Sequence, residues 1–446
     1  MATDEGEDTG AAMQQRSITR SLRMASLPVG FAGRTALGLG RRIGGRQADA
    51  VNAQIQARTA EQVFRVLGEL KGGAMKVGQA MSVFEAALPE EAAQPYRAML
   101  TKLQEAAPAM PADMVTAVMA EELGPDWRSR FADFSEVPAA AASIGQVHKA
   151  IARDGRVVAV KIQYPGARKA LRSDLNQAVR LGRVFGSLVP GLDIKPLLAE
   201  LKARVAEELD YLHESRMQRS FAAAFEDDPD FVVPHVLAAG PRVIVSEWVD
   251  GIPLSEIIAE GTGPQRDRAG LLYLRFLLSG PARAGLLHAD PHPGNFRFTA
   301  DQRLAVVDYG AVGELPQGFP PAIGRLMRVA VESGDADGVL AGLRSEGFVK
   351  AHIEVAAPDV MGYLAPFIEP LRHEQFHYTR IWLRELFKRI NDPRRRDFTI
   401  GMKLNLPASY MLIHRVWMGS TAVLCQLDAH VAARAEVARW VPRFDD

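Results

Sequence analysis

The chain has 446 residues, with 53 Lys and Arg against 53 Asp and Glu, so its formal net charge is zero; 48% of its residues are apolar. At about 100 to 200 residues per domain, this length allows two or three cores, and the composition is that of a globular protein. A zero net charge argues against a dedicated nucleic-acid-binding protein, because phosphate recognition requires an excess of basic residues. We therefore expect a globular protein without a nucleic-acid partner.

Cysteine content and hydropathy define the expected compartment. Cys425 is the only cysteine, which excludes an intramolecular disulfide, and no Cys/His cluster has the spacing of zinc ligands. The apolar stretch 410–427 is interrupted by His414 and Arg415, so we predict no transmembrane helix. The acidic start of the chain does not resemble a signal peptide. We therefore expect the protein to lie in the cytoplasm or on the matrix side of an organelle.

Charge is distributed unevenly along the N-terminal part. Residues 1–12 are predicted to form a disordered acidic tail. Residues 14–48 contain seven arginines and no Asp or Glu, interspersed with apolar residues. The segment 13–48 is thus predicted to be basic and amphipathic, and would bind an anionic membrane surface; the alternative is a solvated helix packed on the protein. Apolar spacings of three and four predict a helical extension at 49–135.

At residue 136 the pattern changes from helical to strand-like, and we place a first lobe at 136–250. A loop of small residues at 138–150 leads into a short strand, and a hairpin turn precedes the β-branched run 156–163. Lys161 lies inside this run. Such a lysine either points to solvent from an edge strand or has a buried partner, because an unpaired buried ammonium is costly.

Two motifs in the second half of the chain favour the interpretation in which Lys161 has a buried partner. The sequence H-A-D-P-H-P-G-N occupies residues 288–295, and Asp-Tyr-Gly occupies 308–310. The step from Asp290 to Asn295 matches the D-x-x-x-x-N of a kinase catalytic loop, and Asp308 takes the place of the D-F-G aspartate. Asn295 and Asp308 are therefore predicted to bind Mg²⁺, which prefers hard oxygen ligands, while Asp290 positions the nucleophile. The expected cofactors are ATP and Mg²⁺.

A kinase-like site also requires a helix carboxylate as partner of the strand lysine. The sequence predicts one amphipathic helix from Pro196 to Phe221, with Glu207, Asp210 and Glu214 on one face. We choose Glu214 as the partner of Lys161, and a solvated acidic face is the alternative.

A hinge between two lobes is predicted at 246–251, after a strand at 242–245. Backbone groups of Glu247 and Val249 would contact adenine there. The second lobe, 251–446, includes a helical C-terminal region.

Together these motifs resemble the UbiB/AarF family of atypical protein-kinase-like proteins, in particular its ubiquinone-biosynthesis kinases. The resemblance extends from about residue 50 to about residue 320 and includes the D-x-x-x-x-N step. Its other motifs are K-x-G-Q at 76–79, A-A-A-S-I-G-Q at 140–146, V-K-I-Q-Y-P-G at 160–166 and E-x-D at 208–210.

The resemblance implies an α+β, two-lobed protein-kinase-like fold with a helical N-terminal extension and a helical C-terminal part. It implies that Lys76 and Gln79 act near the phosphates, and that Glu208 and Asp210 hold the extension in place. It also implies that a loop of small residues replaces the Gly-rich loop over the nucleotide. That loop comprises Ala140, Ala141, Ala142, Ser143, Gly145 and Gln146.

The implied activity is that of a Mg-ATP-binding ATPase that supports ubiquinone or other prenyl-lipid biosynthesis at a membrane surface and phosphorylates a small or lipid-like acceptor. The alternative is a nucleotide-gated lipid-binding pseudokinase with little catalysis. Expected partners are an anionic membrane surface or a prenyl lipid, with peripheral membrane association. Quinone-biosynthesis proteins and a second copy of the chain in a homodimer are alternative partners. The chain departs from ordinary kinases at Ala289, where they have Arg, and at Tyr309, where they have Phe.

Overall fold

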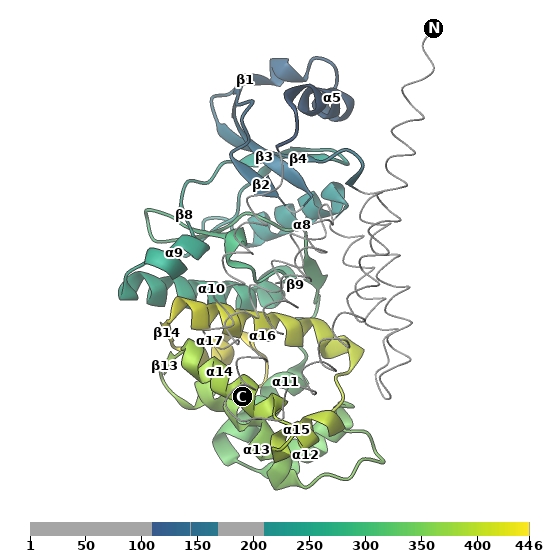
Figure 1. Cartoon of the computed structure of the whole chain (residues 1–446), viewed down its shortest axis with the longest axis vertical. Helices are drawn as coiled ribbons and strands as arrows, with labels where there is room; N and C mark the ends of the chain where they lie inside the picture. Colours follow the sequence, from purple (N-terminus) through teal and green to yellow (C-terminus); the bar gives the residue numbers. More distant parts are fainter. Residues whose placement is uncertain (1–108, 143, 168–208, 446) are drawn as a thin grey trace, which may run out of the picture.

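The computed structural model describes residues 109–142, 144–167 and 209–445 (Figure 1). The predicted acidic tail, the basic segment and most of the helical extension lie outside the described residues. So do four of the predicted site residues, which are Lys76, Gln79, Ser143 and Glu208.

The first lobe is built on an antiparallel sheet with the strand order β1-β3-β4-β7-β6, to which β2 adds by pairing with β3. Buried Val158, Val160 and Ile162 alternate along β4 with residues of the opposite face, which places Lys161 on that opposite face. The strands are β1 (Phe131–Phe134), β2 (Ala140–Ala142), β3 (Gly145–Ala152), β4 (Val157–Gln163), β6 (Val236–Ala239) and β7 (Val243–Glu247).

Helix α5 (Ala112–Leu123) covers the apolar face of this sheet, at the top of Figure 1. Met119 and Trp127, which follows in the short helix η1 (Trp127–Arg130), are buried against it. Glu122 on α5 accepts a 2.8 Å hydrogen bond from Arg242 Nε. Helix α5 and strand β1 therefore belong to the first lobe, whose sheet begins ahead of the boundary expected at residue 136.

Helix α8 (Tyr211–Ala224) begins later than the sequence predicts. Asp210 precedes its first turn as the N-cap, with Oδ1 accepting a 3.0 Å hydrogen bond from His213 N. The prediction of one continuous helix through Asp210 is therefore wrong, and Asp210 and Glu214 do not share a helical face. The physical reason is that an aspartate side chain satisfies a backbone N–H at a helix start, an alternative to lying inside a longer helix.

Two small sheets carry the loops of the second lobe that contain Asp290 and Asp308. One has the order β5-β11-β10-β8, and the other pairs β9 with β12. Both lie near the long helix α10 (Gly263–Ala284), whose apolar residues form the centre of the largest core cluster. The strands are β5 (Phe231–Val232), β8 (Ile252–Pro253), β9 (Leu286–His288), β10 (Phe296–Phe298), β11 (Leu304–Val306) and β12 (Val312–Glu314), with helices α9 (Leu254–Glu260) and η2 (Pro293–Asn295).

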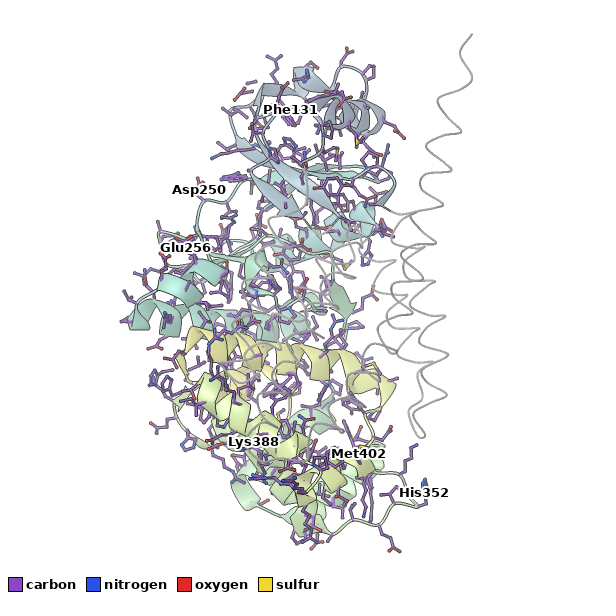
Figure 2. The ribbon with its side chains drawn as sticks, in the orientation of Figure 1. Phe131, Asp250, Glu256, His352, Lys388 and Met402 are labelled. Atoms are coloured by element: carbon purple, nitrogen blue, oxygen red, sulfur yellow. The ribbon has the colours of Figure 1, made fainter. Side chains whose placement is uncertain are left out.

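The C-terminal part is helical, as expected, apart from one short strand pair. Figure 2 shows its exposed Met402 at the far end of the molecule from Phe131 of the first lobe. The elements are α11 (Pro321–Arg328), η3 (Val329–Ser333), α12 (Ala336–Ser345), α13 (Ala357–Ile368), η4 (Glu369–Arg372), β13 (Phe376–His377), α14 (Arg380–Asn391), α15 (Arg396–Lys403), α16 (Ala408–Leu427), β14 (His430–Val431) and α17 (Ala433–Trp440). Within the described ranges, no helix combines the length and apolar character that crossing a membrane requires.

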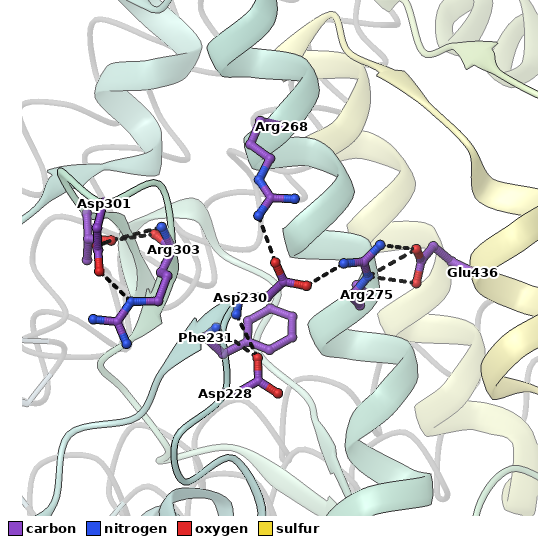
Figure 3. Close-up of polar contacts among 9 residues, drawn as sticks. Asp228, Asp230, Phe231, Arg268, Arg275, Asp301, Arg303 and Glu436 are labelled. Carbon is purple, nitrogen blue, oxygen red and sulfur yellow. Dashed lines mark hydrogen bonds and ion pairs between the residues drawn. The ribbon is translucent and has the colours of Figure 1, made fainter.

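A network of ion pairs joins α10 to its neighbours (Figure 3). Arg275 on α10 lies between Asp230, which precedes β5, and Glu436 on α17. Its guanidinium Nη2 is 2.7 Å from Glu436 Oε1, and Arg268 approaches Asp230 at the same distance. Since the Glu436 side chain is only 6% exposed, the network fixes charges in a largely buried place between α10 and α17.

Candidate active site

Three charged side chains from three separate elements meet at the junction of the two lobes. Lys161 Nζ on β4 donates to Glu214 Oε1 on α8 over 2.6 Å and to Asp308 Oδ2, which follows β11, over 2.8 Å. The side chains of Lys161 and Glu214 are 15% and 4% exposed. The structure thus brings Lys161 to Glu214, as the sequence predicted, and also to Asp308, which the sequence did not predict.

The charges of this cluster control its protonation. Burial alone would lower the pKa of Lys161, but the carboxylates of Asp308 and Glu214 raise it well above its ordinary value. Burial raises the pKa of Glu214, and the neighbouring Lys161 opposes that shift. Lys161 therefore keeps its positive charge at neutral pH, which is the state required to bind a phosphate.

Backbone contacts fix the Asp-Tyr-Gly triplet. Gly310 N donates to Asp308 Oδ1 over 2.9 Å, and the buried imidazole of His288 donates from Nε2 to Asp308 O over 2.8 Å. Tyr309 is fully buried, with its ring centroid 5.2 Å from that of Phe221. The tyrosine therefore occupies the aromatic core, and Asp308 is left at the junction of the lobes.

The hairpin of β10 and β11 brings Asn295 beside Asp308. Phe296 pairs with Val306 in the antiparallel register, and Val307 N donates to Asn295 O over 3.0 Å. Asn295 thus lies opposite Val307, next to the aspartate. Asn295 and Asp308 belong to different motifs, and they are neighbours because the hairpin folds the chain back on itself.

The loop from Ala289 to Asn295 folds around Asp290. Asp290 Oδ1 accepts from His292 N over 3.3 Å, and Asn295 Nδ2 donates to Asp290 O over 3.3 Å. Nδ1 of His292 accepts from Gly294 N over 3.1 Å, so this histidine serves the loop conformation. The loop places the predicted catalytic aspartate and the predicted metal ligand Asn295 on one short, closed segment.

The alanine-rich segment, expected as a loop, is partly a strand. Ala140 on β2 pairs with Val147 on β3, and Val147 pairs with Lys161, so Ala140 and Lys161 lie on the same face of the sheet. Gln146 lies on the opposite face, where its Oε1 accepts from Met110 N over 2.7 Å. The structure therefore does not bring the Gln146 side chain to Lys161.

The turn between β2 and β3 approaches the rest of the lobe closely. Ala142 pairs with Gly145, and Ala141 pairs with Gln146. A Cβ on Gly145 would lie 2.1 Å from Ile162 O, so no other residue fits there without a shift of the backbone.

The predicted hinge connects the sheets of the two lobes, since it follows β7 and precedes β8. Glu247 ends β7, where its backbone N–H donates to His235 O over 3.0 Å and its carboxylate accepts from His235 N over the same distance. Val249 and Asp250 follow, and Figure 2 marks Asp250 on this connection. Glu247 and Val249 therefore lie on or next to the connection between the two sheets.

The donor set at the lobe junction fits Mg²⁺. Asp308 supplies a carboxylate that already binds the ammonium of Lys161, and Asn295 supplies an amide oxygen, since its amide nitrogen donates to Asp290 O. Mg²⁺ is commonly held by one or two such oxygens together with phosphates and water. No cluster of three or more His, Cys, Asp or Glu side chains suited to a metal is present in the described part of the chain.

Sequence reasoning missed two residues that hold the loop 289–295. Tyr273 on α10 donates from its hydroxyl to Pro291 O over 2.7 Å, and Arg415 on α16 donates to Ala289 O over 2.6 Å. In the sequence, Arg415 stood out only as a charge that interrupts an apolar stretch. No local pattern connects either residue to the loop.

Comparisons with known proteins identify the family of the chain. A family model described as the ABC1 atypical kinase-like domain matches residues 102–341, more than half of the chain. The chain is similar to the atypical kinase COQ8B, mitochondrial, of Rattus norvegicus, with 31% identity over 324 residues that cover 70% of this chain. It is also similar to the atypical kinase COQ8, mitochondrial, of Saccharomyces cerevisiae, with 28% identity over 79% of this chain and 72% of the yeast protein.

A solved structure, described as the complex of Rv3197 and erythromycin from Mycobacterium tuberculosis, is 45% identical, with a TM-score of 0.70; the match covers 89% of this chain and 99% of that chain. The chain spans only 60% of the length of the rat protein. The two-lobed α+β fold and the family resemblance predicted from the sequence are confirmed. By its family model, its relatives and its lobe-junction site, this chain belongs to the ABC1 family of atypical kinase-like proteins.

Proposed function

We propose that the chain binds Mg-ATP between its lobes and hydrolyses it, or transfers its γ-phosphoryl group to a small or lipid-like acceptor. The observation that carries this proposal is the meeting of Lys161, Glu214 and Asp308 within hydrogen-bond distance. A charged lysine oriented by a helix carboxylate, next to an aspartate, is the arrangement that kinase-like enzymes use for nucleotide phosphates.

Each residue of the candidate site has a role in this proposal. Lys161 binds the α and β phosphates and is oriented by Glu214. Mg²⁺, held by Asn295 and Asp308, would neutralise phosphate charge. Asp290 accepts the proton of the attacking water or hydroxyl. The β2–β3 turn and the backbone of Glu247 and Val249 would enclose the nucleotide.

Asp290→Asn should separate nucleotide binding from turnover. The variant keeps the shape of the side chain but loses the carboxylate that accepts a proton, so we expect kcat for ATP hydrolysis to fall about 100-fold. The Mg-ATP dissociation constant should stay within about twofold. Calorimetric titration and a phosphate-release assay with the full chain measure the two quantities.

The wild-type protein in the same assays tests the proposed function itself. Mg²⁺-dependent binding with hydrolysis supports it, and no binding of ATP with or without Mg²⁺ contradicts it. Equal hydrolysis by wild type and Asp290→Asn would remove Asp290 from the reaction.

A second candidate is a nucleotide-gated binding protein with little catalysis. It is favoured by the solved relative, which was determined with erythromycin, a ligand that is not a nucleotide. Binding of Mg-ATP without measurable hydrolysis, accompanied by erythromycin binding that changes with nucleotide, would favour this candidate.

The proposed role in ubiquinone or other prenyl-lipid biosynthesis, on the matrix side of an organelle or in the cytoplasm with peripheral attachment to the membrane, rests on the family. Two of its relatives are named as mitochondrial atypical kinases. Deletion of the gene followed by lipid and quinone profiling tests this role, and an unchanged profile would contradict it.

A further inference from the structure

One face of helix α16 lies against the loop 289–295 and against strand β12. Leu412, Arg415 and Gly419 are spaced by three and four residues, so they share one side of the helix. Arg415 Nη2 donates to Ala289 O over 2.6 Å. A Cβ on Gly419 would lie 2.5 Å from Pro291 Cγ, and a Cβ on Gly313 of β12 would lie 2.0 Å from Leu412 Cδ2. The helix is therefore fitted closely to this part of the site.

The contact made by Arg415 acts on the peptide group directly before Asp290. Ala289 O belongs to the peptide bond that joins Ala289 to Asp290, so a hydrogen bond to this oxygen limits rotation of that peptide plane. A charged donor makes the bond stronger than a neutral one would. On the other side of Asp290, Tyr273 donates to Pro291 O over 2.7 Å. Two different helices thus hold the chain on both sides of Asp290: Arg415 acts at the peptide group directly before it, and Tyr273 acts at the peptide group that follows Pro291.

Close packing of the helix makes this contact possible. At Gly419 any side chain would meet the ring of Pro291, so glycine lets the axis of α16 approach the loop. Figure 1 shows α16 running alongside α10, the helix that carries Tyr273. In this chain the residue before Asp290 is Ala289, so the loop has no guanidinium of its own beside the aspartate, and α16 brings one from 126 residues away in the chain.

We propose that Arg415 is a positioning residue for Asp290, and that α16, through Arg415 and Gly419, sets the catalytic loop in its working conformation. The proposal rests on the proposed function, because the rate that Arg415 governs is that of ATP hydrolysis or phosphoryl transfer. Arg415 is itself an exposed residue. Its hydrogen bond therefore adds little to folding stability, and its main effect is on the geometry of the loop.

Arg415→Ala should lower kcat without changing nucleotide affinity. A misplacement of a catalytic group by about 1 Å costs on the order of 100-fold in rate, so we expect kcat to fall about 10- to 100-fold. KM for ATP and the Mg-ATP dissociation constant should stay within about twofold, and the unfolding midpoint should change little. Arg415→Lys, which keeps a charged donor, should recover part of the rate. The control is His414→Ala, on the same helix, which should leave kcat unchanged.

Hydrogen exchange of the full chain without nucleotide gives a readout that does not depend on activity. In Arg415→Ala, amides of residues 289–295 should exchange faster than in the wild type. The exchange rates of amides in the long helices should stay unchanged. If the wild type hydrolyses no ATP, the proposed function fails, and the exchange result alone still decides whether Arg415 holds the loop.

Gly419→Ala offers a second test that keeps the arginine. The added methyl group must move α16 away from Pro291, so kcat should fall as in Arg415→Ala, and the double variant should lose less than the product of the two effects. Unchanged kcat and unchanged exchange in Arg415→Ala would overturn the proposal. Equal losses of rate, nucleotide affinity and thermal stability would also overturn it, since they indicate a purely structural role.

Discussion

Asp308→Asn should reduce the rate of Mg²⁺-dependent ATP hydrolysis about 1,000-fold, the largest effect expected of any single substitution at the site. A metal ion that stabilises the transferring phosphoryl group contributes several kcal/mol, and a neutral amide holds Mg²⁺ far less well than a carboxylate. The binding of ATP should also lose most of its dependence on Mg²⁺. Phosphate release and calorimetric titration with and without Mg²⁺ measure both effects.

The Asp308→Asn variant should still fold. Lys161 keeps Glu214 as its partner at 2.6 Å, so its ammonium is not left buried without a counter-charge. The matched control is Asp301→Asn, at the turn of the same β10–β11 hairpin, where the side chain is 57% exposed. This control should hydrolyse ATP within about twofold of the wild-type rate. Wild-type hydrolysis and wild-type Mg²⁺ dependence in Asp308→Asn would remove Asp308 from the metal site.

Arg275→Met should lower the free energy of unfolding by about 3 kcal/mol. Methionine fills much of the same space but leaves Asp230 and Glu436 facing each other without their shared cation, and loss of one partner from a buried ion pair is strongly destabilising. The two carboxylates are 20% and 6% exposed, so water only partly compensates them. Urea denaturation followed by circular dichroism measures the difference.

Figure 3 contains the matched control for this substitution. Arg303 pairs with Asp301 at 2.6 Å, but these side chains are 37% and 57% exposed. Arg303→Met should therefore cost less than about 1 kcal/mol. If Arg275→Met is no more destabilising than Arg303→Met, the buried network does not stabilise the fold.

Acid should reduce the difference between wild type and Arg275→Met. Burial alone would raise the pKa of Asp230, but hydrogen bonds from Arg268 and Arg275 lower it below its ordinary value. A lowered folded-state pKa gives stability that is present above the unfolded pKa, about 3.9, and is lost as the pH falls through the folded value. The two proteins should therefore approach each other in stability below about pH 4.

Local sequence patterns predicted the parts of the site that lie close together in the chain. The step from Asp290 to Asn295 and the Asp-Tyr-Gly triplet lie on single loops, and the strand at 243–247 overlaps the predicted strand at 242–245. The β-branched run also placed Lys161 on a strand. The strand predictions are confirmed because side-chain periodicity is set by neighbouring residues.

Predictions that needed the course of the backbone between elements were less accurate. The helical periodicity did not indicate that Asp210 caps α8, because a side-chain hydrogen bond to the backbone competes with helix continuation. The composition of residues 140–142 predicted a loop, whereas these residues form strand β2 because they pair with β3. Gln146 belongs to the same motif as other residues predicted to bind the nucleotide. Its side chain nevertheless faces Met110, because alternate residues of a strand point to opposite sides.

By itself, the sequence determined the fold class, the family and the order of the site motifs, because each is encoded in short spacings and in residue types. Only the tertiary structure decided which distant groups touch. Lys161 reaches Asp308 across 147 residues, and Arg415 reaches Ala289 across 126. Contacts of this kind depend on how lobes and helices pack, and packing is a property of the whole folded chain rather than of any local pattern.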